Sequence, residues 1–463
     1  MPGRGLVVGV VVVAWLVAPS VTRAQEPLAL DSVTIVDPAT GRSVPGQTVL
    51  IRDGAIESVG AAGSVDVPED ARYVSLAGKY LLPGLIDFHV HLRSTSELLS
   101  YLRHGVTTVV QLSGGLGGAP DILQYRRELD TGQRVGPTLY ASGPIIDGDP
   151  PLNPGVSVAV GDEAETLVAV RAQSDAGYDL IKVYNRLPTD LLGPLVDEAH
   201  RLGMPVIGHV PRPDDRSTAL QAALTSGLDV IAHGEEVFFT YFHAGVDSLL
   251  DLGRIPWRST EDVDRVTGWL LDAGTAVIPN LSFVAATRTQ LDSIDALWRD
   301  PEFEHLEPDV QRFWRTGGFA ETVEDLERFS RRELAKEAFL DELTVAFQRA
   351  GVPLLLGTDA SYVGLFPGTS AHLELARLVE AGLTTAEALA AATGTPGTFL
   401  YDHGLSAAPL GAITEGARAD LLVLDADPLA DIDAVSDIAA VVSRGRLYSM
   451  EELDRLRERA RQR

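Results

Sequence analysis

Two histidines stand one residue apart at the end of the apolar segment LLPGLIDFHVHL, residues 81–92. The segment has the composition of a buried strand, and alternate residues of a strand point to the same side. His89 and His91 are therefore expected to present two imidazoles to one point. Four further apolar segments carry polar side chains at or near their ends that could bind a metal ion or transfer a proton. These residues are Lys182, His209, His233 and Asp359.

Strand-like and helical segments alternate through the middle of the chain. The strand-like segments are LLPGLIDFHVHL, GVTTVVQLS, TLYASGPII, DLIKVYN, PVIGHV, DVIAHG, AVIPNLSF and VPLLLGTDA. This alternation predicts an α/β protein with a (β/α)8 TIM-type barrel over residues 80–404, rather than an open doubly wound sheet, which usually has fewer strands. Because active sites of such barrels lie at the C-terminal ends of the strands, the six residues are expected to meet there.

Imidazole and carboxylate groups that converge on one point suit a divalent metal ion such as zinc. Six ligating groups are too many for one tetrahedral ion and suit two, with a position left for water as in catalytic sites. Lys182 is the unusual member, because an ammonium group beside metal ions loses its proton readily. A neutral lysine can add carbon dioxide to form a carbamate that bridges two ions. The alternative is a surface lysine, but DLIKVYN sets Lys182 among apolar residues.

The motifs PGLIDFHVHL, LIKVY, VIGHV, VIAHG and LGTDA, in this order, resemble the amidohydrolase superfamily. The branch that the chain resembles most is that of the prolidase-like and imidazolonepropionase-like bacterial hydrolases. The flanking segments LVEAGLTTAEALAAATGTPGTFL and GAITEGARADLLVLDADP are also similar, so the resemblance extends from Asp31 to about Tyr448. The segments IPNLSF and AHGEE depart from common family patterns without changing an expected ligand, and they leave the substrate pocket open.

The resemblance implies a role for each residue of the set. His89, His91 and Asp359 would hold one metal ion, His209 and His233 a second, and carboxylated Lys182 would bridge them. A hydroxide shared by the two ions would be the nucleophile. Asp359 would take its proton and pass it to the leaving nitrogen as general acid. Deaminases of the superfamily use one metal and lack this lysine, so Lys182 favours amide cleavage.

Three further residues are candidates for substrate contact. Tyr184 follows Lys182 by two residues and is expected to face the same way, either toward substrate or as a cap on the barrel core. Arg212 would bind a substrate carboxylate as a bidentate hydrogen-bond donor, or it would be exposed to solvent in its loop. His372, in GTSAHLELARL, would touch substrate or cap a helix.

Short alternating segments at both ends of the chain predict a small β-sandwich-like domain assembled from residues 25–79 and 405–450, followed by a charged tail over 451–463. The connection at about 284–350 is too long for a single helix and has a helical pattern. It is expected to form an additional helical layer, a lid at the catalytic face or an oligomer interface. The family resemblance also makes a homo-oligomer possible.

Residues 1–24 carry a basic residue, a short apolar segment and small residues before Gln25, which is the arrangement of a secretory signal peptide. The alternative is an uncleaved anchor, but the apolar segment is shorter than the roughly 20 residues needed to span a bilayer. We therefore expect an exported protein, periplasmic or extracellular, without stable membrane insertion after cleavage. The net charge of −27 argues against nucleic-acid binding.

These features together predict a binuclear metal-dependent amidohydrolase that acts on small molecules such as Xaa-Pro dipeptides or N-acyl amino acids. Its expected cofactors are two divalent ions, with zinc as the first choice. One alternative is a hydrolase of cyclic amides, imidazolones or lactones. Another, from a different class, is a metal-free barrel that serves as a binding module.

Overall fold

The computed structural model describes residues 26–114, 121–212, 218–241, 260–316 and 325–461. The expected signal peptide, residues 1–24, lies outside the described residues. Within them, no helix has the length and apolar character that crossing a membrane requires.

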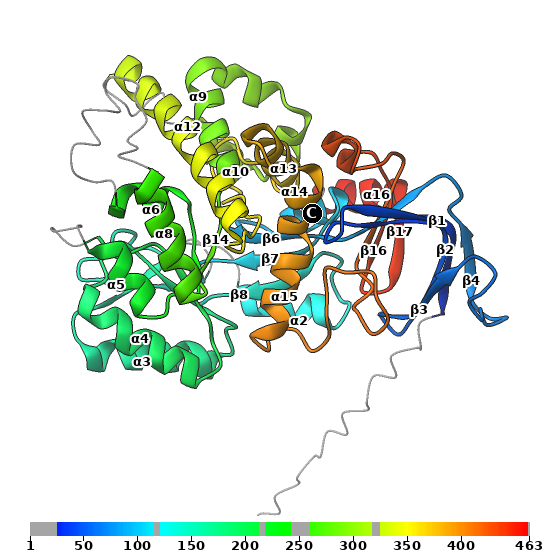
Figure 1. The fold of residues 1–463 in the computed structure, drawn as a ribbon, viewed down its shortest axis with the longest axis horizontal. Helices are drawn as coiled ribbons and strands as arrows, with labels where there is room; N and C mark the ends of the chain where they lie inside the picture. The colour runs from blue at the N-terminus through cyan, green and yellow to red at the C-terminus, as the bar shows by residue number, and fades with distance from the viewer. Residues whose placement is uncertain (1–25, 115–120, 213–217, 242–259, 317–324, 462–463) are drawn as a thin grey trace, which may run out of the picture.

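Strands from both ends of the chain form one sheet in the order β17-β16-β15-β5-β1-β2-β3, with β4 paired to β1. The two ends of the chain meet where β5 pairs antiparallel with β15, with Leu81 opposite Val423. Figure 1 shows β1 to β4 beside β16 and β17 at one end of the molecule. The predicted domain boundaries stay predictions, but this pairing shows which strands lie together. The strands are β1 Leu28–Asp37, β2 Arg42–Arg52, β3 Ala55–Ala61, β4 Arg72–Ser75, β5 Tyr80–Pro83, β15 Leu421–Leu424, β16 Ile438–Ser443 and β17 Arg446–Ser449.

Two parallel sheets occupy the middle of the chain, in the orders β6-β7-β8 and β10-β9-β11-β12-β13-β14. Single parallel bridges join Ser142 to Leu180, Val277 to Leu354 and Val90 to Ala360. The parallel α/β architecture is therefore confirmed, whereas the closed barrel stays a prediction that these bridges support. The strands are β6 Leu85–Val90, β7 Val106–Gln111, β8 Thr138–Ala141, β9 Ile145–Gly148, β10 Ser157–Val160, β11 Ile181–Val183, β12 Val206–Gly208, β13 Val230–Ile231 and β14 Ala276–Val277.

One apolar cluster draws on the successive parallel strands, which explains why their sequences are nearly continuously hydrophobic. A second, larger cluster packs the outer faces of the strands against the helices. Removal of this apolar surface from water is the main favourable term that holds strands and helices together. Members of the first cluster include Ile86, Val110, Tyr140, Leu180, Ile207, Val230, Ala276 and Leu355.

Local signals in the sequence explain where several helices begin and end. Asp162 accepts a hydrogen bond from the Glu165 amide at the start of α3, and Gly177 ends this helix with φ 90°. Thr384 and Glu387 form a reciprocal capping box at the start of α14. The helices outside the 281–350 region are α1 Ser96–Arg103, α2 Ile122–Asp130, α3 Glu163–Ala176, α4 Thr189–Arg201, α5 Ala219–Thr225, α6 Glu235–Tyr241, α8 Thr260–Ala273, α13 Thr369–Ala381, α14 Thr385–Ala392, α15 Gly394–Asp402 and α16 Met450–Arg461, with a 3-10 turn, η2, at Ile432–Ser436.

The long connection is helical where it is described. It contains α9 Leu281–Arg299, the 3-10 turn η1 Pro301–His305, α10 Pro308–Thr316 and α12 Leu326–Ala350. Trp314 is fully buried in a separate apolar cluster and its ring lies 4.7 Å from that of Phe366. In Figure 1, α9 and α12 project on the same side of the parallel strands. The connection thus packs on the loop that follows Asp359.

Candidate metal centre and active site

A cavity of about 370 Å³ lies at the C-terminal ends of the parallel strands. The structure brings all six proposed metal ligands and Tyr184 into its lining, which agrees with their expected positions at strand ends. Their individual roles stay predictions. The other lining residues are Arg93, Ile145, Asn153, Val156, Glu235, Phe283 and Tyr362.

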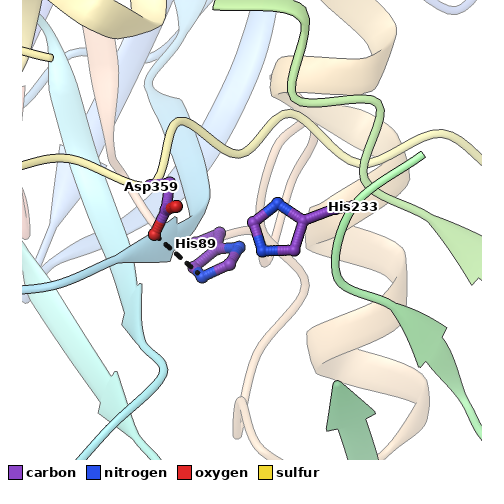
Figure 2. A group of neighbouring side chains, drawn as sticks. All are labelled: His89, His233 and Asp359. Carbon is purple, nitrogen blue, oxygen red and sulfur yellow. Dashed lines mark ion pairs between the residues drawn. The ribbon is translucent and has the colours of Figure 1, made fainter. Parts of the chain in front are cut away.

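The donor atoms of His89, His233 and Asp359 lie close enough to share an ion. One ligand atom of each residue lies within 4.8 Å of the others (Figure 2). Asp359 Oδ1 is 3.4 Å from His89 Nε2 and 2.9 Å from His91 Nε2. A set of imidazole nitrogens and a carboxylate oxygen is suited to a divalent ion of the zinc type.

The outer nitrogens of the first two histidines are held by other groups. His89 Nδ1 lies 3.3 Å from the Ala232 carbonyl oxygen, and His91 Nδ1 lies 3.2 Å from Ser113 Oγ. A hydrogen bond at Nδ1 fixes the ring and favours the tautomer whose Nε2 carries the free lone pair. Both histidines therefore present Nε2 toward Asp359.

His209 and His233 are held in the same way by residues that sequence analysis did not single out. His209 Nδ1 lies 3.0 Å from Asn185 Oδ1 and 2.9 Å from Glu236 Oε1. His233 Nδ1 donates to Asn280 Oδ1 at 2.8 Å, with the Asn280 amide oriented so that its nitrogen donates to the carbonyls of residues 357 and 358. Asn185 and Glu236 each follow a proposed ligand by three residues, a local signal that could have indicated them.

Burial sets the protonation of these groups. It lowers the pKa of His89 and His209, and it lowers the pKa of His233 to about 3, so these imidazoles are neutral near pH 7. For Asp359, burial acts to raise the pKa, but the imidazoles of His89 and His91 outweigh it and hold the pKa well below its usual range. Neutral imidazoles beside an ionised carboxylate are the protonation states that metal ligation requires.

Lys182 is the most informative residue of the cavity. It is 1% exposed, and its Nζ has no hydrogen-bond partner among the described residues. Burial lowers its pKa to about 8. A buried amine without partners is costly unless another group satisfies it. A carboxylated lysine that ligates metal would meet this requirement, so the donor set fits the expected ions.

A buried carboxylate fixes the backbone around Asp359, which has a left-handed conformation with φ 63°. Asp87 accepts hydrogen bonds from Thr358 N at 3.1 Å and from Thr358 Oγ1 at 2.6 Å. The Asp359 amide in turn donates to the carbonyl of His89 at 2.8 Å. These contacts tie β6 to the segment that carries Asp359, so strand-end ligands distant in sequence hold one geometry.

Two expected substrate residues are not brought to the cavity. Arg212 donates to Glu236, with Nε at 3.3 Å from Oε2, and its guanidinium lies 4.3 Å from the centre of the Phe239 ring. His372 Nε2 lies 2.8 Å from the carbonyl oxygen of His104, and its ring packs on the His104 ring. Neither side chain lines the cavity. In this structure Arg212 instead contacts Glu236, and His372 packs near the end of α1, so their contact with substrate stays a prediction.

Arg93 is the lining cation that sequence analysis missed. Its Nε donates to the Ser361 carbonyl oxygen at 3.2 Å, and its guanidinium lies 4.2 Å from the centre of the Phe313 ring. Among the described residues, its two terminal nitrogens donate no hydrogen bond and remain available to a ligand. The alternation His89, His91, Arg93 was the signal, because it continues the spacing of the two histidines by one more step.

Fold and site together define a candidate metal centre at one end of the parallel strands. A candidate prolidase from Bifidobacterium longum is 26% identical, with a TM-score of 0.68 over 95% of this chain and all of that one. Bottromycin amidohydrolase is 25% identical, with a TM-score of 0.71 over 94% of this chain and 90% of that one. The dihydroorotase of Anaeromyxobacter sp. (strain K) is 41% identical over 71 residues, which is 15% of this chain and 16% of that enzyme.

No family model matches the chain. The structural likeness nevertheless extends over nearly its whole length, and the expected resemblance is confirmed. The chain is similar to proteins of the amidohydrolase superfamily, and its structural neighbours are hydrolases of that superfamily.

Proposed function

We propose that this protein is a binuclear metal-dependent hydrolase that cleaves carbon–nitrogen amide bonds of small molecules. His89, His91 and Asp359 would hold one divalent ion, and His209 and His233 a second, with carboxylated Lys182 shared between them. The observation that carries the proposal is the buried, unpartnered Nζ of Lys182 in a cavity that four imidazoles also line. When bound, the ions would lower the pKa of water and polarise the scissile carbonyl.

Asp359 is the proton carrier in this proposal. It lines the cavity as a carboxylate, and its backbone is fixed by contacts with Thr358 and β6. A carboxylate in this position can accept a proton from water and deliver it to the leaving nitrogen. Phe283 and Tyr362, whose ring centres lie 5.3 Å apart, form an aromatic wall that helps to exclude bulk water.

Arg93 indicates which amides fit. A guanidinium with free terminal nitrogens in a largely buried wall is suited to a carboxylate. This favours substrates that carry a carboxylate near the scissile bond, such as Xaa-Pro dipeptides and N-acyl amino acids, over lactones and uncharged cyclic amides.

The test is a hydrolysis assay on the purified, zinc-supplemented protein. Alanyl-proline, N-acyl amino acids, their C-terminally amidated forms, and a cyclic amide and a lactone would be compared by chromatography of the products. We expect cleavage of the carboxylate-bearing amides, loss of activity after dialysis against a chelator, and recovery with added zinc. Faster cleavage of the lactone or cyclic amide, or no cleavage of any amide, would contradict the proposal.

A further inference from the structure

A second acidic side chain, Glu235, lines the cavity without being one of the proposed metal ligands. It is the first residue of α6 and follows His233 by two positions. Its side chain is 20% exposed, so it is largely desolvated but still open to the cavity. A carboxylate in such a place interacts strongly with any charge that enters.

Glu235 is held by a buried ion pair from the helical connection. Lys336 Nζ, on α12, lies 3.1 Å from Glu235 Oε2 and 2.7 Å from Glu333 Oε2. Lys336 is 7% exposed and Glu333 is also 7% exposed. One ammonium group therefore serves two carboxylates, which leaves this cluster with a net negative charge. Only Glu235 of the three lines the cavity.

The opposite charge lies on another part of the lining. Arg93 follows β6, whereas Glu235 follows β13, and these strands are not paired neighbours. The cavity thus offers a guanidinium at one place and a carboxylate at another. This pattern is complementary to a zwitterion, with a carboxylate at one end and an ammonium group at the other.

We propose that Glu235 binds the ammonium group of the substrate and thereby selects dipeptides with a free amino terminus over N-acyl amino acids. The inference rests on the proposed amide hydrolysis and narrows its substrate class. In a dipeptide, the ammonium group is on the carbon next to the scissile carbonyl. Glu235 is correspondingly close in sequence to His233, one of the proposed metal ligands. Lys336 positions the carboxylate, and α12 contributes to specificity through it.

The experiment compares two substrates that differ only at this group. Alanyl-proline carries the ammonium, whereas N-propanoyl-proline has hydrogen in its place. Values of kcat/KM are measured for the wild type and for Glu235→Gln, which retains an oxygen for Lys336. Glu333→Gln is the matched control, because it removes the other carboxylate on Lys336 without touching the cavity. The metal content of each protein is measured alongside.

The wild type is expected to prefer alanyl-proline by about ten- to a hundredfold, the range of one charge-assisted hydrogen bond. Glu235→Gln should reduce the ratio of the two kcat/KM values to near one with unchanged metal content, and Glu333→Gln should keep the wild-type ratio. An unchanged ratio in Glu235→Gln, or a wild type that cleaves both substrates equally, would overturn the inference and leave amide hydrolysis intact. If the metal-loaded wild type cleaves neither substrate nor any other amide, the proposed function itself is wrong.

Discussion

Glu236→Gln tests whether the contacts behind the histidines control the metal centre. Glu236 is fully buried, and its Oε1 lies 2.9 Å from His209 Nδ1. Its Oε2 accepts from Val210 N at 3.2 Å and from Arg212 Nε at 3.3 Å. Glutamine offers one acceptor oxygen instead of two, so its amide nitrogen would face a donor from one of these groups.

The magnitude follows from the burial of these partners. Loss of one member of a buried ion pair costs about 3–5 kcal/mol. Because the Arg212 side chain is 21% exposed, solvent screening reduces this cost, and we expect the free energy of unfolding to fall by about 2–3 kcal/mol. A changed partner behind a ligating histidine typically lowers metal affinity by about 10- to 100-fold. We expect both effects.

The assay combines competition with a chromophoric chelator for metal affinity and denaturant unfolding for stability. Glu198→Gln is the control, because Glu198 also accepts from two arginines, Arg171 and Arg201, but lies on α4 outside the cavity lining. This variant should bind metal like the wild type. If Glu236→Gln also retains wild-type metal affinity, the contact between Glu236 and His209 Nδ1 does not determine metal affinity. This result would refute the argument that hydrogen bonds to the Nδ1 atoms of the histidines support the metal centre.

The other predictions concern stability, metal affinity and processing. Burial raises the pKa of Glu97 to about 7, above the usual value of 4.5, so unfolding releases a proton between these pH values and the wild type loses stability as the pH rises through this window. Between pH 5.5 and 7, the free energy of unfolding of the wild type should fall by about 2 kcal/mol more than that of Glu97→Gln, as measured by denaturant titration. The same dependence on pH in both proteins would contradict this prediction. A Cβ at residue 357 would lie 2.8 Å from His89 Cβ, so Gly357→Ala should displace this proposed ligand and lower metal affinity. Gly268→Ala is the control, because a Cβ at this position in α8 has no neighbour within 4 Å. It should raise the free energy of unfolding by about 0.5–1 kcal/mol. Mass spectrometry of the exported protein should show a chain that begins at Gln25, and a retained leader would contradict the expected signal peptide.

Five of the proposed ligands lie in a parallel strand or within two residues of its end, whereas Asp359 follows a segment that has only an isolated bridge at Leu354. A strand fixes the side on which alternate residues point, and the parallel arrangement brings strand ends to one face, so local patterns located His89, His91 and Lys182. The order of apolar segments likewise predicted the parallel α/β architecture. The pairing between β5 and β15 joins residues more than 300 positions apart. The alternating apolar and polar residues at both ends of the chain were the signal in the sequence for this pairing.

Residues beyond the strand ends were less predictable, because loops and helices set their directions. Arg212 stands three residues after His209, but its loop turns the guanidinium back to Glu236. His372 lies in the first turn of α13, where packing against α1 directs its ring to the His104 carbonyl. Glu236 and Asn280 depend on how α6 and α9 begin, which the strand pattern does not determine.

The most direct test of a two-ion centre is the metal content of the purified protein and of Lys182→Ala, measured by inductively coupled plasma mass spectrometry after removal of loosely bound ions. Two ions per chain in the wild type, falling to one or fewer in the variant, is the result expected if the buried Lys182 is a shared ligand. The same metal content in both proteins would contradict this role for Lys182, and with it the binuclear site.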